Sequence, residues 1–425
     1  MLNRATPPDF HPIENVPVLS PDRIDLSNGS KMFVFNAGEE ELVRIQWVFE
    51  NAAFQLDKPI VNSALSGMLL EGTSQYTSAQ IAETVDFYGA YLFPEFSYDH
   101  MSLNLITLTK YVDKLLPVVI SVLNDAIFPQ QELDTYIRNS KQSLNISLQK
   151  NDYVARRNFN NVLFGNSRYG YIYEENDYDL LNREDLISLY RSQIVPANCT
   201  LLVAGKISRE TLDYISEQVE SQWVNPTQKS LTTVPAFQQV APKVLVIEKE
   251  KALQSAIRIG SMSIQRSHPD FPALQVLNAT LGGYFGSRLM MNIREDKGYT
   301  YGIGSGLGSL KYAGFFTISS EVGTSVCAAT LKEIEFEINR LRQEKISLNE
   351  LTLVKNYLLG SMVGSLENVF SHADKFKQVY FSGLTLDYYD YYSQQVKDVT
   401  PERLMDLANK YLDYDQMTKV IVGKL

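Results

Sequence analysis

An arginine and a tyrosine, Arg294 and Tyr301, are the residues of this chain whose types and spacing best fit a chemical role. Apolar residues at helical spacing precede Arg294, so we expect it on the last turn of a helix. Gly298 follows where a left-handed helix cap is expected, and the alternation after it predicts a strand that carries Tyr301. The guanidinium and the phenol should then lie towards one edge of a cleft. There they could hold a peptide carbonyl, or the oxyanion that it becomes.

The segment around this pair resembles the arginine–tyrosine motif of the zinc peptidase family that contains pitrilysin, insulysin and the mitochondrial processing peptidases. In that family a glycine-rich turn and an S-R-L triplet precede R-E-x-x-G-x-x-Y. The matching positions here are Ser287-Arg288-Leu289, Arg294, Glu295, Gly298 and Tyr301. The preceding Gly282, Gly283 and Ser287 fit two interpretations: close approach of a substrate or partner strand, or tight packing of helices.

The zinc ligands of the family are missing from this chain. Active members carry H-x-x-E-H on an early helix, where two histidines one turn apart bind zinc and the glutamate acts as general base. The comparable helix here is residues 59–73, and counting back from Gly72 places Ser63 and Gly67 at the histidine positions and Ser66 at the glutamate position. A serine and a glycine cannot replace imidazole ligands, and Ser66 cannot act as a carboxylate base.

The third ligand of the family is a glutamate on a later helix, which corresponds to residues 132–151. The best register places Gln142 or Ser143 at this position, so we take Ser143 as the degenerate residue at the third ligand position. The chain is therefore predicted to bind no metal and no other cofactor.

No other catalytic constellation replaces the missing zinc site. The four histidines, His11, His100, His268 and His372, are scattered, and we expect them to be ordinary surface or hydrogen-bonded side chains. Cys199 lies in an apolar run and is expected to be a small buried hydrophobe. The sequence contains neither a G-x-S-x-G elbow nor a phosphate-binding G-x-x-x-x-G-K-[ST] loop. The glycine-rich run 302–308 follows a helix and continues into a strand, which is the wrong order for a dinucleotide loop.

Composition bounds the remaining possibilities. The 425 residues are 44% hydrophobic and 21% charged, which is ordinary for globular domains and long enough for two of them. The formal net charge of −10 argues against nucleic acid or an anionic membrane as the main partner. The first thirty residues lack the apolar core of a signal peptide, and two cysteines give no disulfide framework, so we expect a cytoplasmic protein.

A segment near the middle of the chain is repeated at its end. Residues 182–207 align without a gap with residues 400–425, and both read as an N-cap, an amphipathic helix, a short turn and a buried strand. The identical pairs include Glu184/Glu402, Leu186/Leu404, Leu189/Leu407, Thr200/Thr418, Gly205/Gly423 and Lys206/Lys424. This repeat predicts two related halves.

We therefore predict an α+β fold with two homologous α/β-sandwich halves. Strands and helices occur in runs rather than in single alternation, which disfavours a doubly wound parallel sheet. The predicted domains are residues 1–224, with the degenerate metal site, and residues 244–425, with the arginine–tyrosine motif; residues 225–243 are polar and proline-containing and read as a linker. The family resemblance implies that the halves face each other as a clamshell.

The resemblance also implies a function. In family members built from two kinds of subunit, one chain holds zinc, while the other lacks zinc and supplies the arginine and the tyrosine. This chain is similar to the second kind, as found in two-subunit bacterial members. The implied partners are a homologous zinc-bearing subunit and a peptide substrate, and the chain alone should be inactive as a peptidase. The alternatives are a non-enzymatic scaffold and a stand-alone peptide-binding protein of the same fold.

Overall fold

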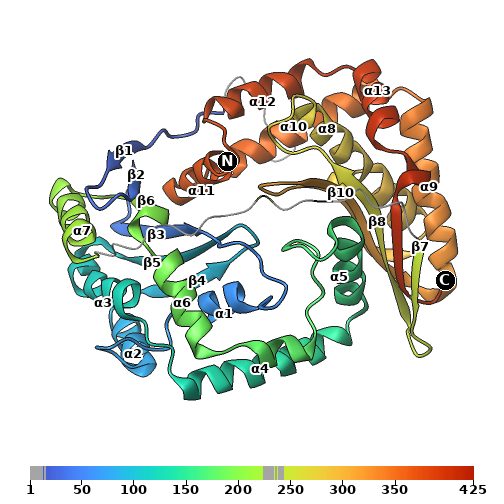
Figure 1. Ribbon diagram of the computed structural model, residues 1–425. Coiled ribbons are helices and arrows are strands. Elements are labelled where there is room, and N and C mark those ends of the chain that lie inside the picture. The colour runs from blue at the N-terminus through green and yellow to red at the C-terminus, as the bar shows by residue number, and fades with distance from the viewer. Residues whose placement is uncertain (1–12, 14–15, 224–233, 235–236, 238–243) are drawn as a thin grey trace, which may run out of the picture.

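The computed structural model describes residues 13, 16–223, 234, 237 and 244–425. Within these residues the chain forms two α/β halves that lie opposite each other (Figure 1). Apart from Val234 and Phe237, the predicted linker, residues 225–243, lies outside the described residues.

The first half begins with three strands and continues through helices to a further strand pair, more helices, a last strand and a final helix. Its strands and helices are β1 (Asp22–Asp25), β2 (Lys31–Asn36), β3 (Leu42–Glu50), α1 (Val61–Met68), α2 (Ser78–Phe87), β4 (Tyr91–Phe96), β5 (His100–Leu108), α3 (Val112–Asp125), α4 (Gln130–Leu148), α5 (Asn151–Phe164), α6 (Arg183–Gln193), β6 (Cys199–Gly205) and α7 (Arg209–Gln222).

The second half follows a similar course. Its elements are β7 (Val244–Glu248), β8 (Gln254–Ser263), α8 (Phe271–Asn278), the π-helical segments η4 (Ala279–Gly283) and η5 (Met290–Asp296), β9 (Thr300–Ser309), β10 (Gly314–Gly323), α9 (Cys327–Gln343), α10 (Leu348–Gly364), α11 (Val369–Tyr380), α12 (Asp387–Asp398), α13 (Pro401–Tyr411) and β11 (Thr418–Gly423).

The two sheets have the same topology. The strand order is β1-β2-β6-β3-β5-β4 in the first half and β7-β11-β8-β10-β9 in the second. In each sheet one pair is parallel, β2 with β6 and β7 with β11, and the other pairs are antiparallel. When β2 is matched with β7, the remaining strands correspond in order, and only β1 has no counterpart. The predicted fold class, two homologous α/β halves, is confirmed.

The repeated segment forms the same unit in both halves. Asn182 and Thr400 each accept a hydrogen bond as the N-cap of a helix, α6 and α13, which leads through a 3₁₀ turn into the buried strand, β6 or β11. Both strands end at a glycine with positive φ, +148° at Gly205 and +135° at Gly423. The identity of these glycines therefore reflects a shared backbone conformation that other residues rarely adopt.

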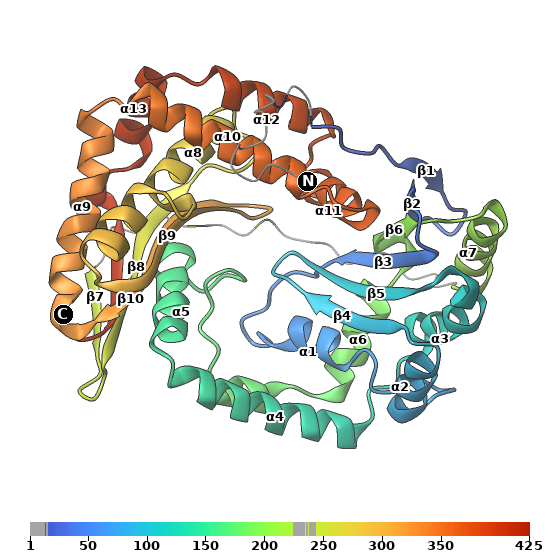
Figure 2. The same cartoon turned by 180° about the vertical axis from the view of Figure 1, so that it is seen from behind.

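One helix of each half packs on the sheet of the other half (Figures 1 and 2). Helix α5 of the first half packs on β8 and β11, where Phe159 and Leu163 meet Val420 and Val422. Helix α11 of the second half packs on β2 and β6, with Phe376 4.6 Å from Phe33 between ring centroids. Separating the halves would expose both apolar interfaces, so this exchange holds the clamshell together.

No helix in the described part of the chain is both long enough and apolar enough to cross a lipid bilayer.

Candidate functional site

Helix α1 carries Ser63, Ser66 and Gly67, the three positions that the sequence predicts to match H-x-x-E-H. The helix runs from Val61 to Met68, shorter than the predicted residues 59–73, and Gly72 then takes a φ of +132°. The Ser63 hydroxyl donates a hydrogen bond of 2.9 Å to the Ile60 carbonyl, and the Ser66 side chain is buried. Gly67 is exposed, and it faces helix α4.

A tyrosine fills the space between α1 and α4 at these positions. A Cβ atom added to Gly67 would lie 2.6 Å from Cε2 of Tyr136, which is closer than real Cβ contacts allow. The Tyr136 phenol interacts with the hydroxyls of Ser140 and Ser63, and burial raises its pKa above the ordinary tyrosine value, so the phenol stays neutral. No imidazole fits at position 67 while Tyr136 is in place.

The predicted third position is not on the part of α4 that meets α1. Both Gln142 and Ser143 are exposed, whereas Tyr136 is the α4 residue whose side chain reaches Ser63. The residues between the two helices do not fit zinc, because serine hydroxyls, a neutral phenol and a glycine supply neither imidazole nor carboxylate. Among the described residues no group of three or more histidines, cysteines, aspartates or glutamates could hold a metal ion.

The sequence alone does not indicate the role of Tyr136. It lies on the predicted helix and has a second polar residue, Ser140, one turn later, but nothing in the local pattern indicates that it packs on Gly67. That contact joins residues 69 positions apart, and only the packing of α1 on α4 creates it.

Arg294 lies in the π-helical segment η5, which Gly298 ends with a φ of +65°. The Gly298 amide donates to the Arg294 carbonyl at 3.1 Å, which confirms the predicted left-handed cap. The Arg294 guanidinium lies over the Phe285 ring at 4.6 Å, and Nη1 is 3.4 Å from Oε1 of the neighbouring Glu295. The side chain is 32% exposed, so its donors remain accessible to a ligand.

Tyr301 lies in a bulge of β9, the edge strand of its sheet. Ser320 pairs with Ile303 but Val322 pairs with Thr300, so β9 has one residue more than β10 over this interval. The hydroxyl of Thr300 holds the bulge, because it donates to the Glu321 carbonyl at 2.7 Å and accepts from the Gly302 amide at 3.1 Å. The Tyr301 side chain is 92% exposed. Bulges often redirect a side chain in this way.

The structure therefore places Arg294 and Tyr301 on either side of the Gly298 turn, with both side chains accessible to solvent. It does not pack the two against each other, since almost the whole Tyr301 ring is uncovered. Nothing in the local pattern predicted the bulge.

The glycines before the motif serve packing inside the second half. A Cβ on Gly282 would lie 2.7 Å from the Ser305 amide in β9, and one on Gly283 would lie 3.1 Å from Nδ2 of Asn278. The next residue of the motif, Arg288, makes a two-point ion pair with Glu350 at 2.9 and 3.0 Å. The packing interpretation accounts for Gly282 without any substrate.

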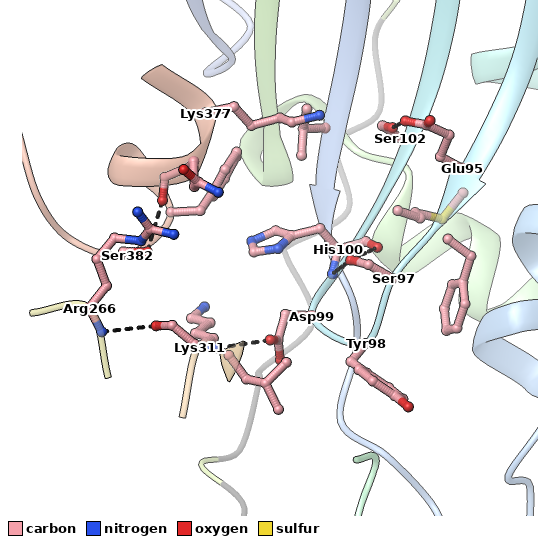
Figure 3. A pocket seen from close by; sticks show the side chains of 17 residues that line it. Glu95, Ser97, Tyr98, Asp99, His100, Ser102, Arg266, Lys311, Lys377 and Ser382 are labelled. Atoms are coloured by element: carbon pink, nitrogen blue, oxygen red, sulfur yellow. Dashed lines mark hydrogen bonds between the residues drawn. The ribbon is translucent and has the colours of Figure 1, made fainter. Parts of the chain in front are cut away.

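A separate pocket of about 640 Å³ lies between the two halves (Figure 3). It is lined by the β4–β5 turn, by the tip of the β9–β10 hairpin and by α11, and it contains His100. Neither Arg294 nor Tyr301 lines it. Tyr301 is about 26 Å along β9 from Ser309 at the pocket, at about 3.3 Å per residue.

Comparisons with known proteins agree with this fold. The family described as "Peptidase M16 inactive domain" matches residues 180–358, which include Arg294 and Tyr301. "Uncharacterized zinc protease YmxG" from Bacillus subtilis is 24% identical over 313 residues, 73% of this chain and 75% of that protein. "Non-peptidase homolog YmxG" from Helicobacter pylori is 21% identical over 365 residues, 84% of this chain and 82% of that protein.

Two solved structures show the same fold over nearly the whole chain. The crystal structure of a peptidase M16 inactive domain from Pseudomonas fluorescens has a TM-score of 0.84 at 23% identity and covers 95% of this chain and 98% of that one. The crystal structure of a protease from Helicobacter pylori has a TM-score of 0.86 at 17% identity and covers 95% of this chain and 100% of that one.

Proposed function

We propose that this chain, which is similar to the M16 zinc peptidases, the family of pitrilysin, insulysin and the mitochondrial processing peptidases, is a non-catalytic, substrate-binding subunit of a heteromeric member. Its partner is a homologous subunit that carries H-x-x-E-H and holds the zinc. Arg294 and Tyr301 are supplied by this chain to hold the peptide or to stabilise the oxyanion during hydrolysis.

One contrast between the two halves carries the proposal. In the first half, the ring of Tyr136 occupies the space that an imidazole at position 67 would need. In the second half, Arg294 and Tyr301 remain accessible, and Tyr301 is turned outward by a bulge that Thr300 holds. A family member with a filled metal site and exposed arginine–tyrosine residues is suited to bind substrate for another subunit.

The position of the pair on β9 supports binding of an extended peptide. Because β9 is an edge strand, it has a strand neighbour on one side only in the described fold, and an extended peptide could add to its outer side near Tyr301. Such pairing would bring peptide carbonyls towards the Gly298 turn, where the Arg294 guanidinium and the Tyr301 phenol can donate hydrogen bonds. The zinc, and the water that it activates, belong to the partner.

The alternative is a scaffold or peptide-binding protein without any role in hydrolysis. The name of the Helicobacter pylori relative, a non-peptidase homolog, favours this alternative for that relative. The two functions differ in one measurable respect, because only the proposed subunit increases peptide hydrolysis by a zinc-bearing partner.

The test is reconstitution with a homologous H-x-x-E-H chain from the same organism. Arg294→Ala and Tyr301→Phe should each lower kcat/KM of the pair by about a hundred- to a thousandfold, since one oxyanion donor contributes about 3 to 4 kcal/mol. Arg209→Ala, at an arginine that is 85% exposed on α7, is the matched control and should leave the rate unchanged. Normal turnover in both site variants would remove the proposed role.

A further inference from the structure

The pocket between the two halves is built from both of them (Figure 3). The first half contributes residues 95–102 around the β4–β5 turn. The second half contributes Arg266, the hairpin tip at residues 309–311, and the end of α11 with Lys377 and Phe381. Its volume of about 640 Å³ is in the range of small-molecule sites.

Two of the charges at the pocket are already compensated by protein groups. The Asp99 carboxylate accepts from the Tyr169 hydroxyl at 2.6 Å and from the Lys311 amide at 3.0 Å, and Arg168 lies 3.6 Å from it. The Lys311 ammonium pairs with Glu50 at 3.0 Å. These groups join the halves and leave little charge for a ligand.

The Arg266 guanidinium is different. Within the described part of the chain it has no carboxylate partner; it lies over the rings of Phe271 and Tyr388, each 5.7 Å from the ring centroid. Lys377 adds a second cation whose nearest carboxylate, Asp374, is 3.9 Å away. Glu95 is the one carboxylate lining the pocket, besides Asp99, among the described residues. Positive charge therefore exceeds negative charge around the space.

A neutral hydrogen-bonding group also lacks a partner. The His100 ring packs on Phe381 with centroids 4.2 Å apart and the ring planes tilted by 51°, and its Nε2 atom is buried without a hydrogen-bond partner in the described structure. Burial lowers the pKa of His100 to about 4, so the ring is neutral near pH 7. Figure 3 shows the imidazole projecting towards the side of the pocket that carries Arg266 and Ser382. A buried polar atom of this kind normally has a partner.

We propose that this pocket binds an organic monocarboxylate, with Arg266 as the charged partner of the carboxylate and His100 as a neutral hydrogen-bonding group. The planar fork of an arginine matches the two oxygens of a carboxylate. Glu95 disfavours a second negative charge, and Phe96, Leu310 and Phe381, which line the pocket, provide apolar surface for the body of the ligand. The carboxylate is that of a small free acid or of a peptide C terminus, and either would contact both halves.

The experiment uses this chain alone, so it does not depend on the partner subunit or on Arg294 and Tyr301. Binding is measured by titration calorimetry and by the ligand-dependent rise of Tm with four probes: isovalerate, a mixture of N-acetylated tetrapeptides with free C termini, the same mixture as C-terminal amides, and inorganic phosphate. At least one of the two acids should bind and raise Tm, whereas the amides and phosphate should not. Whichever acid binds identifies the source of the carboxylate.

The variants assign the binding to the pocket. Arg266→Met should weaken binding at least about tenfold, and Arg266→Lys should recover part of it because it restores the charge without the fork. Arg209→Met, on the distant exposed helix α7, should bind as the unmodified chain does. The assignment is overturned if neither acid binds, if the amides or phosphate bind as well as the acids, or if folded Arg266→Met retains full affinity.

Discussion

The Tyr136 ring lies against Gly67 so closely that a single added carbon at position 67 would be 2.6 Å from Cε2 of the ring. The sequence predicts that position 67 matches the second histidine of H-x-x-E-H. If this match holds, the chain differs from zinc-binding members in more than its ligands, because the Tyr136 ring occupies the space that the histidine would need.

This contact predicts an unusual effect of a mild substitution. Replacing a glycine by alanine inside a helix normally raises the free energy of unfolding by about 1 kcal/mol. Gly67→Ala should instead lower the free energy of unfolding by about 1 to 3 kcal/mol, because the ring must move. Urea unfolding measures the change.

The matched control is Gly360→Ala in α10, where an added Cβ meets no atom within 4 Å. It should be neutral or stabilising. In the Tyr136→Ala background the penalty of Gly67→Ala should disappear, and equal effects in both backgrounds would show that the ring is not its cause.

The exchanged helices predict that the halves unfold together. Phe376, on α11 of the second half, is nearly buried against β2 and β6 of the first. Phe376→Ala should cost about 3 to 5 kcal/mol. Both tryptophans of the chain, Trp47 and Trp223, are buried in the first half, so their fluorescence reports that half alone.

The midpoint of the tryptophan transition in urea should therefore shift, although the substitution is in the other half. Phe87→Ala, at a phenylalanine that is 81% exposed in the first half, should change the midpoint little. An unshifted tryptophan transition in folded Phe376→Ala would mean that α11 does not stabilise the first sheet.

His100 predicts a loss of stability in mild acid. Its pKa is about 4 in the folded protein and 6.5 ordinarily, so the unfolded chain binds a proton between these values and the folded chain does not. Stability from this group is complete above pH 6.5 and falls as the pH drops towards 4, by at most about 3 kcal/mol.

Unfolding free energies at pH 7 and pH 5 measure this effect. The decrease should be smaller in His100→Gln, which cannot take up the proton, than in the unmodified chain. Identical decreases in the two proteins would show that His100 is protonated equally in both states.

Because the Thr300 hydroxyl holds the bulge that carries Tyr301, we expect its removal to affect activity. Thr300→Val removes the hydrogen bonds to Glu321 and from Gly302, so the bulge should relax and Tyr301 should turn away from its present direction. We expect the free energy of unfolding to fall by about 1 to 2 kcal/mol. We also expect peptide hydrolysis with the partner to fall, even under conditions where the variant remains fully folded. Thr352→Val, on an exposed turn of α10, is the control, and full activity in Thr300→Val would contradict the role of the bulge.

The features that could be predicted from the sequence are those that depend on residues close together in the chain. The Gly298 cap, the alternating strands and the repeated helix–strand unit with its final glycine each depend on neighbouring residues, and the structure has them.

The features that were missed depend on contacts between distant residues. The packing of Tyr136 on Gly67, the exchange of α5 and α11, and the pocket that joins His100 to Arg266 all require the assembled fold. His100 was expected to be an ordinary surface or hydrogen-bonded histidine, and this was wrong: its Nε2 is buried without a partner in the described structure. Local sequence patterns do not indicate which side chains of one half contact side chains of the other half.

The most direct test of the account is the zinc content of the purified chain after dialysis against excess zinc, measured together with peptide hydrolysis. We predict far less than one bound zinc per chain and no hydrolysis, because Ser63, Ser66 and Gly67 offer no ligand set and Tyr136 fills the space between the helices. One tightly bound zinc per chain, together with peptide cleavage by the isolated protein, would contradict it.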